Sequence, residues 1–282
     1  MHNASASDQG FTLIELSIVL VIIGLIVGGV LVGQDLIRAA EVRATISQIE
    51  KYNTAVNTFR GKYNALPGDL NAATATAFGF AARGTAPGMG DGNGVIEGSA
   101  SAAANGFLQG GETLSFWGDL SVGNSAAPLN INLVDGSFNT YTAPSVAAPS
   151  IASGAQASYF PAAKLGRGNY VYVYSTGGTN YYGISAVTST ASGVMTSGVS
   201  ITAQQAYQID KKVDDGYPIT GNVTATYTTG ALAENNAAAT ASHTASPAAA
   251  VDCYDSTTTA PNYALSYNNG AAATCALSFR FQ

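Results

Sequence analysis

Oxygen-bearing side chains gather in one glycine-rich stretch of the chain, residues 84–98. Within it, the segment DGNGVIE (residues 91–97) matches the middle of an EF-hand-type calcium loop when the two are aligned on Gly94. In such loops, acid and amide side chains supply oxygen ligands, and the residue after the glycine offers its backbone carbonyl. The residues that this pattern selects as candidate calcium ligands are Asp91, Asn93, Val95 and Glu97.

The two ends of this loop do not fit the calcium pattern. Met89 stands where the first ligand is expected, and Ala100 stands where a bidentate glutamate is expected. The sequence therefore favours a turn without metal and predicts no other cofactor. A structural calcium ion completed by Glu97 or Glu112 is the alternative. A phosphate-binding loop is not supported, because no Gly-Lys-Ser/Thr ending follows the glycines.

The remaining chemistry of the sequence argues against an enzyme. The chain of 282 residues has only two histidines, His2 and His243, which nearly excludes a histidine-based triad or a multi-histidine metal site. No nucleophile–base pair stands out elsewhere. The formal net charge of −6 argues against a nucleic-acid-binding surface spread over the molecule, and no specific nucleic-acid site is evident.

An apolar segment lies close to the amino terminus. Leu16–Gly33 is a run of 18 residues without a charge, long enough for a transmembrane helix. A cleavable signal peptide fits poorly, because no Lys or Arg precedes the run and no A-x-A-like site follows it. Glu15 lies at the start of this segment. It is either solvated at the membrane interface or paired with a positive group on a neighbouring subunit.

The residues around this glutamate, Gly10-Phe11-Thr12-Leu13-Ile14-Glu15, closely resemble the prepilin signature of type IV pilins and type II secretion pseudopilins. The resemblance implies cleavage between Gly10 and Phe11 by a prepilin peptidase, which also methylates the new amino terminus at Phe11. It further implies that Glu15 neutralises the terminal amine of an adjacent subunit during assembly. An ammonium and a carboxylate buried together are tolerated, whereas either alone is not.

The periodicity of the following residues predicts that the helix continues to about Tyr63. Val42, Ile49, Val56 and Phe59 belong to an apolar stripe at three- and four-residue intervals. Pro67 and Gly68 then end the helix. We therefore expect an α+β, pilin-like fold, with a long N-terminal helix (a membrane half and an amphipathic half) packed on a mainly antiparallel β head. The expected parts are a leader at 1–10, a transmembrane half at 11–33, an amphipathic half at 34–64, and an extracytoplasmic head with a disulfide loop at 65–282.

Several segments of the head have recognisable patterns. Four segments are expected to be strands: Asn130–Val134, Asn169–Ser175, Tyr181–Val187 and Ala276–Phe281. The second and third are expected to form a hairpin. Its tyrosines either pack across the two strands or form an adhesive surface. Residues 112–122 predict a short helix or strand with Trp117 in the core. Ala203–Lys211 predicts a helix, followed by a turn in which Asp214 and Asp215 either pair with Lys211 and Lys212 or bind a cation.

Cys253 and Cys275 are the two cysteines of the chain. If the head lies outside the cytoplasmic membrane, an oxidising compartment makes a disulfide the default. A zinc site is a poor alternative, because no histidine partners are present. A carboxy-terminal disulfide loop is also what the resemblance to type IV pilins implies.

Together these features favour a structural subunit of a type IV pilus-like filament. The resemblance implies a single-pass precursor in the bacterial inner membrane, with a cytoplasmic amino terminus and an extracytoplasmic head, and a mature form in a pilus or pseudopilus. Its implied partners are identical or related subunits, the prepilin peptidase and an inner-membrane assembly platform. The alternatives are a type II secretion pseudopilin and a membrane-anchored binding protein that does not polymerise.

Overall fold

The computed structural model describes residues 12–84, 88–98, 110–121, 131–139, 150–191, 193–226, 230–232, 252–255, 261–266 and 268–281. The chain divides into two units, one ending at Glu41 and the other comprising Val42–Gln282. The boundary between them falls inside the first helix, α1 (Leu13–Tyr63), next to its first buried residue, Val42. Each unit is described by itself below.

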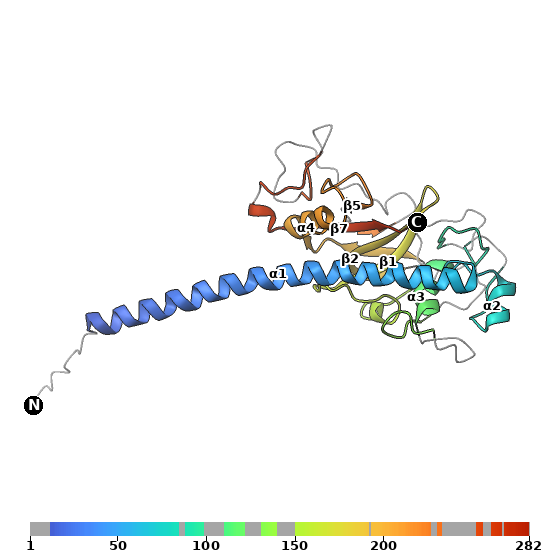
Figure 1. The fold of residues 1–282 in the computed structure, drawn as a ribbon, viewed down its shortest axis with the longest axis horizontal. Helices are drawn as coiled ribbons and strands as arrows, with labels where there is room; N and C mark the ends of the chain where they lie inside the picture. Colours follow the sequence, from blue (N-terminus) through green and yellow to red (C-terminus); the bar gives the residue numbers. More distant parts are fainter. Residues whose placement is uncertain are drawn as a thin grey trace, which may run out of the picture. The chain divides into compact units, whose positions relative to one another are not determined.

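The second half of α1 belongs to the larger unit. Its buried side chains include Val42, Ile49, Val56 and Phe59, which recur at three- and four-residue multiples along the predicted apolar stripe. Contacts from Tyr52 to Tyr182 place this part of the helix against the sheet, where Figure 1 shows it beside β1 and β2. The helix ends at Tyr63, as predicted.

A left-handed residue follows the end of α1. Asn64 has φ +53°, and its N–H donates to the carbonyl of Arg60 at 2.8 Å. Asparagine tolerates this conformation better than most residues and is a common choice after a helix. The chain then enters Leu66–Asp69, the Pro-Gly turn that the sequence predicts as the helix stop.

The head contains a mainly antiparallel sheet, as predicted. Its centre is the hairpin of β1 (Asn169–Thr176) and β2 (Thr179–Ala191), in which Tyr174 pairs with Tyr181 and Thr176 with Thr179. β2 also pairs with two other strands, β3 (Val194–Gly198) and β7 (Ala273–Arg280). The remaining described strands are β4 (Ile201–Thr202) and β5 (Val223–Thr226), which pair with β7, and β6 (Gly230–Leu232), which pairs with β3.

Short helices complete the described head: α2 (Ala72–Phe78), α3 (Gly111–Leu120) and α4 (Ala203–Val213), with 3₁₀ turns at Gln156–Ser158 and Asn268–Gly270. The predicted strand at Asn130–Val134 is wrong where the structure describes it, because residues 131–139 form an irregular segment. The N–H groups of Leu133 and Val134 both donate to the carbonyl of Leu120 at the end of α3, at 3.0 and 3.2 Å. These two N–H groups therefore form hydrogen bonds with the end of a helix and not with a neighbouring strand.

Aromatic side chains form the centre of the core. Trp117 of α3 is fully buried, with its ring centroid 4.7 Å from that of Tyr52 and 6.2 Å from that of Tyr182. This confirms the prediction that Trp117 is a core residue. Tyr172 and Tyr174 of β1 are buried as well, and the ring of Tyr174 stacks on that of Tyr181 across the hairpin with centroids 5.4 Å apart, so cross-strand packing, and not an adhesive surface, accounts for these tyrosines.

Candidate functional site

The amino-terminal site begins where α1 begins. Gly10 and Phe11, the predicted processing residues, lie outside the described residues. In the described part, the N–H and hydroxyl of Thr12 donate to Oε2 of Glu15 at 2.8 and 2.7 Å, and the N–H of Glu15 lies 3.4 Å from the hydroxyl oxygen of Thr12. This reciprocal pair is a capping box, which satisfies backbone donors that a helix start leaves without partners. Thr12 was missed as a partner of Glu15, although the T-x-x-E spacing signals it.

In the first unit, the described residues 12–41 are Thr12 and the apolar half of α1, and none of them is buried. Its large aliphatic side chains from Leu13 to Ile37 are all exposed; Leu13, for example, is 90% and Leu25 is 73% exposed. The helix is long and apolar enough to cross a membrane. Apolar surface of this extent is unfavourable in water, so the segment requires lipid or other apolar helices around it.

A second site is the glycine-rich loop predicted to bind calcium. Gly90, Gly92 and Gly94 all have positive φ values, which turn successive backbone N–H groups toward neighbouring carboxylates. Asp69 accepts from the N–H groups of Gly92 and Gly94, both at 2.7 Å. A side chain at Gly90 would also collide with the carbonyl oxygen of Leu70, because its Cβ would lie 2.2 Å away.

Glu112 of α3 holds the other side of this loop. Its Oε1 accepts from the N–H of Gly90 and its Oε2 from the N–H of Glu97, each at 2.8 Å. From the sheet, the amide of Asn180 accepts from the N–H of Ile96 at 2.8 Å and donates to the carbonyl of Gly94 at 2.9 Å. Side chains from three distant segments therefore fix one short loop.

Three carboxylates meet at the loop: Asp69, Asp91 and Glu112 each offer an oxygen within 4.8 Å of the others. Burial raises the pKa of Asp69 to about 6, and the charge of Asp91 adds to the rise. Burial also raises the pKa of Glu112 well above its usual range, with a further contribution from Asp69. Close carboxylates in a low-dielectric setting favour either protonation or a bound cation.

The gathered residues differ from the predicted ligand set. Asp91 belongs to the cluster, but Asn93 uses its side-chain oxygen to accept from the N–H of Val95 at 2.6 Å. Glu97 lies beside the cluster, 3.4 Å from the amide nitrogen of Asn93. An oxygen-only donor set suits a hard cation such as calcium, so calcium binding at Asp91 stays a prediction. Asp69 was missed, because it is distant in sequence and no spacing rule connects it to Asp91.

A buried ion pair anchors the turn that carries Asp69. Arg83 Nη2 lies 2.6 and 2.7 Å from the two carboxylate oxygens of Asp119 in α3. Asp119 Oδ2 also accepts from the N–H of Gly68 at 2.7 Å. Both charged side chains are nearly inaccessible to solvent, so removing one partner would leave an uncompensated charge in the core.

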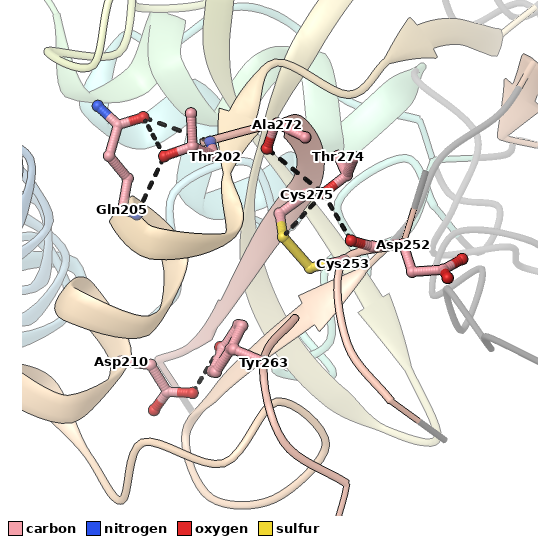
Figure 2. The surroundings of a disulfide bond; sticks show 9 residues. All are labelled: Thr202, Gln205, Asp210, Asp252, Cys253, Tyr263, Ala272, Thr274 and Cys275. Carbon is pink, nitrogen blue, oxygen red and sulfur yellow. Dashed lines mark hydrogen bonds between the residues drawn. A yellow bond between two sulfur atoms is a disulfide. The ribbon is translucent and has the colours of Figure 1, made fainter. Parts of the chain in front are cut away.

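The two cysteines form the predicted disulfide between Cys253 and Cys275, with a Cα–Cα distance of 5.0 Å. Figure 2 shows the bond joining the segment around Asp252 to β7. Thr274 reinforces the same junction by donating its hydroxyl to the carbonyl of Asp252 at 2.9 Å. Both cysteines are buried, so the bond is part of the core of the head.

A second acidic group surrounds the turn after α4. Tyr263 donates its hydroxyl to Asp210 at 2.6 Å, as Figure 2 shows, and burial raises the pKa of Asp210 to about 6. Asp215 accepts from the N–H of Tyr217 at 2.8 Å, and Asp214 accepts from the N–H of Asn222. The sequence predicted that Lys211 pairs with Asp214 or Asp215. In the structure its ammonium group instead lies 3.0 Å from the hydroxyl of Tyr207.

Comparison with known proteins identifies only the amino-terminal site. Residues 5–31 match the family described as the prokaryotic N-terminal methylation motif. No curated protein and no solved structure matches the chain. The match encloses Gly10, Phe11 and Glu15 and ends within the apolar half of α1. The chain therefore carries, at residues 5–31, the signature of type IV pilins and pseudopilins.

Proposed function

We propose that this chain is a structural subunit of a type IV pilus-like filament. A prepilin peptidase would cut between Gly10 and Phe11 and methylate Phe11, and the subunits would then polymerise through the first half of α1. The observation that carries this proposal is the methylation motif at residues 5–31 followed by an apolar helix whose large aliphatic side chains, from Leu13 to Ile37, are all exposed in the single chain. Such a helix fits both a membrane precursor and a helical filament core.

Glu15 has a specific place in this assembly. In the single chain its carboxylate accepts from the N–H and hydroxyl of Thr12, so it caps the start of α1 without a neighbour. Cleavage would create a new amine at Phe11, and moving that amine and Glu15 into an apolar filament core is tolerable only if the two charges pair. A carboxylate has acceptor capacity for Thr12 and for an ammonium group from an adjacent subunit at the same time.

The head has features expected of an extracytoplasmic domain. The precursor would lie in the bacterial inner membrane with its amino terminus in the cytoplasm, and the assembly platform would extract it into the filament. The buried disulfide supports an oxidising compartment for the head. The motif supports a role as a structural subunit.

A type II secretion pseudopilin is the second candidate. It is favoured by the unbroken α1, which has no proline between Leu13 and Tyr63, and by the segment Tyr63–Asp69 that follows. A membrane-anchored binding protein that never polymerises is a third candidate. A pilus subunit differs from the other two in where the processed chain is found, so its location is the property to measure.

The test is mass spectrometry of filaments sheared from the cell surface and of the membrane fraction. Recovery of the chain in filaments with a methylated Phe11 terminus supports a pilus subunit. The same terminus found only in the membrane fraction points to a pseudopilin or an anchored protein. Gly10→Ala should leave uncut precursor, and normal mature protein from that variant would refute the processing site.

Two matched variants separate the roles of Glu15. Glu15→Ala removes both the cap and the charge and should be cleaved but absent from filaments. Thr12→Ala removes the cap hydroxyl but keeps the carboxylate, so it should still assemble. Equal loss of assembly in both variants would show that Glu15 acts as a helix cap and not as a charge partner.

A further inference from the structure

A groove of about 400 Å³ lies on the head beside the second half of α1. Its inner surface is apolar and includes the buried residues Ala55 and Val134. Its helical wall carries the short hydroxyl side chains of Ser47, Thr54 and Thr58. Short side chains leave space for a long side chain to enter and to bury its hydrocarbon part.

The rim of this groove is acidic. Glu50 and Asp135 are both exposed there, and Lys51 offsets one of the two negative charges. Asp135 lines the groove together with Tyr52, whose pKa burial raises to about 12, with a further rise from the charge of Asp135. Among the described residues, neither Glu50 nor Asp135 is in an ion pair. The groove therefore suits a long cationic side chain, with its stem inside and its charge at the rim.

One turn of the head presents such side chains. Lys164 and Arg167 are both exposed, and in the part of the chain that the structure describes neither is in an ion pair. Gly166, Arg167 and Gly168 have φ values of +70°, +55° and +73°, so an arginine occupies a left-handed position at the tip. A residue with a long side chain is uncommon in this conformation.

The turn is held firmly by the rest of the head. The N–H of Lys164 donates to the side-chain oxygen of Gln48 at 2.9 Å, and the amide nitrogen of Gln48 donates to the carbonyl of Ala162 at 2.9 Å. The N–H of Asn169 closes the turn on the carbonyl of Gly166 at 3.0 Å. Arg167 is therefore presented on a fixed support, which lowers the entropic cost of a contact.

We propose that the groove receives the Lys164–Gly168 turn of a second copy of this chain, with the stem of Arg167 against Ala55 and Val134 and its guanidinium beside Glu50 and Asp135. This proposal rests on the proposed filament function and names the contact between neighbouring heads. The turn and the groove are different surfaces, so the contact is heterologous. A heterologous contact that does not close into a ring generates an open helical assembly.

The positions of the turn and the groove along α1 set the shift between neighbouring copies that this contact requires. Gln48, which holds the turn, and Thr54, in the middle of the groove wall, are six residues apart on the helix, or roughly 9 Å at 1.5 Å per residue. A second copy shifted by this amount along its own helix axis would have its turn level with the groove. Charge complementarity would then select the register of the two heads.

The test is a charge-reversal pair, measured as the amount of the chain in sheared filaments relative to the membrane fraction. Arg167→Glu and Asp135→Lys should each lower this ratio at least ~10-fold, because each places like charges in contact. The double variant restores opposite charges across the interface and should recover most of the wild-type ratio. Lys212→Glu, a charge reversal at an exposed lysine outside the turn, is the matched control and should assemble normally.

The outcomes separate this contact from the proposed function. Two results would overturn the contact alone, provided that the wild-type chain is found in filaments. In one, the single variants assemble as well as the wild type; in the other, the double variant reaches no higher filament-to-membrane ratio than the single variants. Absence of the wild-type chain from all filaments would overturn the proposed function and the contact with it. Thermal unfolding of each purified variant checks folding, and Arg167→Asn, which suits a left-handed position, removes the charge without reversing it.

Discussion

The two carboxylate clusters of the head have the same chemistry but differ in how the chain assembles them. Asp69, Asp91 and Glu112 come from three separate segments and hold a loop between α3 and the sheet. Asp210, Asp214 and Asp215 come from one short stretch and close the turn after α4. The first cluster therefore determines long-range packing, whereas the second mainly determines local backbone geometry. Removing an acid should accordingly cost more stability in the first cluster.

The largest effect is expected for Glu112→Ala. This change leaves the N–H groups of Gly90 and Glu97 without their acceptor and opens a cavity at a fully buried position. We expect a loss of about 3–5 kcal/mol in the free energy of unfolding, measured by denaturant titration. Asp215→Ala is the matched control in the exposed part of the second cluster and should cost less than about 1 kcal/mol. Equal losses would show that the two clusters contribute alike.

The disulfide is expected to have the next largest effect. Replacing Cys253 and Cys275 by serine should cost about 3 kcal/mol, because a loop with a sequence separation of 22 residues is no longer closed in the unfolded chain. Tyr263→Phe removes only the hydroxyl that donates to Asp210 and should cost about 1 kcal/mol. A Tyr263→Phe variant as unstable as the serine variant would mean that the hydrogen bond to α4, and not the covalent closure, stabilises this region.

Stability should fall as the pH rises from about 4 to about 7. The folded state raises the pKa of Asp69 to about 6 and that of Glu112 well above its usual range, so between these pH values it binds more protons than the unfolded chain. The contribution of these two groups to stability is complete below the pKa values that they have in the unfolded chain. It is lost as the pH rises through the higher pKa values that they have in the folded protein. Melting temperatures across this range, without divalent cations, measure the slope.

The same titration compares the two clusters directly. Burial also raises the pKa of Asp210 to about 6, whereas in the first cluster the charge of Asp69 additionally raises the pKa of Glu112. Asp69→Asn should therefore flatten the pH dependence, and Asp210→Asn should flatten it less. A steeper change from Asp210→Asn would reverse the expected order of the two clusters.

Local patterns of the sequence predicted much of this fold. The apolar stripe predicted the second half of α1, and the predicted end of the helix lies within one residue of its observed end at Tyr63. The turn at residues 177–180 predicted the hairpin of β1 and β2. The prediction of a strand at residues 130–134 was wrong, because the N–H groups of Leu133 and Val134 donate to the carbonyl at the end of α3. The spacing of apolar residues indicates only the local preference for helix or strand. It cannot show that the end of another helix will accept the hydrogen bonds that a strand would need.

The sites show the same limit. The spacing of Gly10 to Glu15 identified the amino-terminal motif, and the family comparison matches it. The loop at Asp91 was found from its glycines, but Asp69 and Asn180 approach it only through the tertiary fold. Such partners are separated from the motif by many residues, so a single sequence carries no signal that connects them.

The smallest expected effect is also the sharpest test of the first cluster. If calcium binds beside Asp91, adding it at about pH 7.5 should raise the melting temperature and flatten the pH dependence, because the cation would neutralise Asp69 and Glu112 in place of protons. At a concentration of 100 times Kd the gain would be about 2.7 kcal/mol, and less for a weak site. Asp91→Asn changes an exposed residue, so it should keep the fold and lose most of the response. Identical melting curves of the wild-type protein in calcium and in EDTA would mean that hydrogen bonds and protonation alone hold the loop.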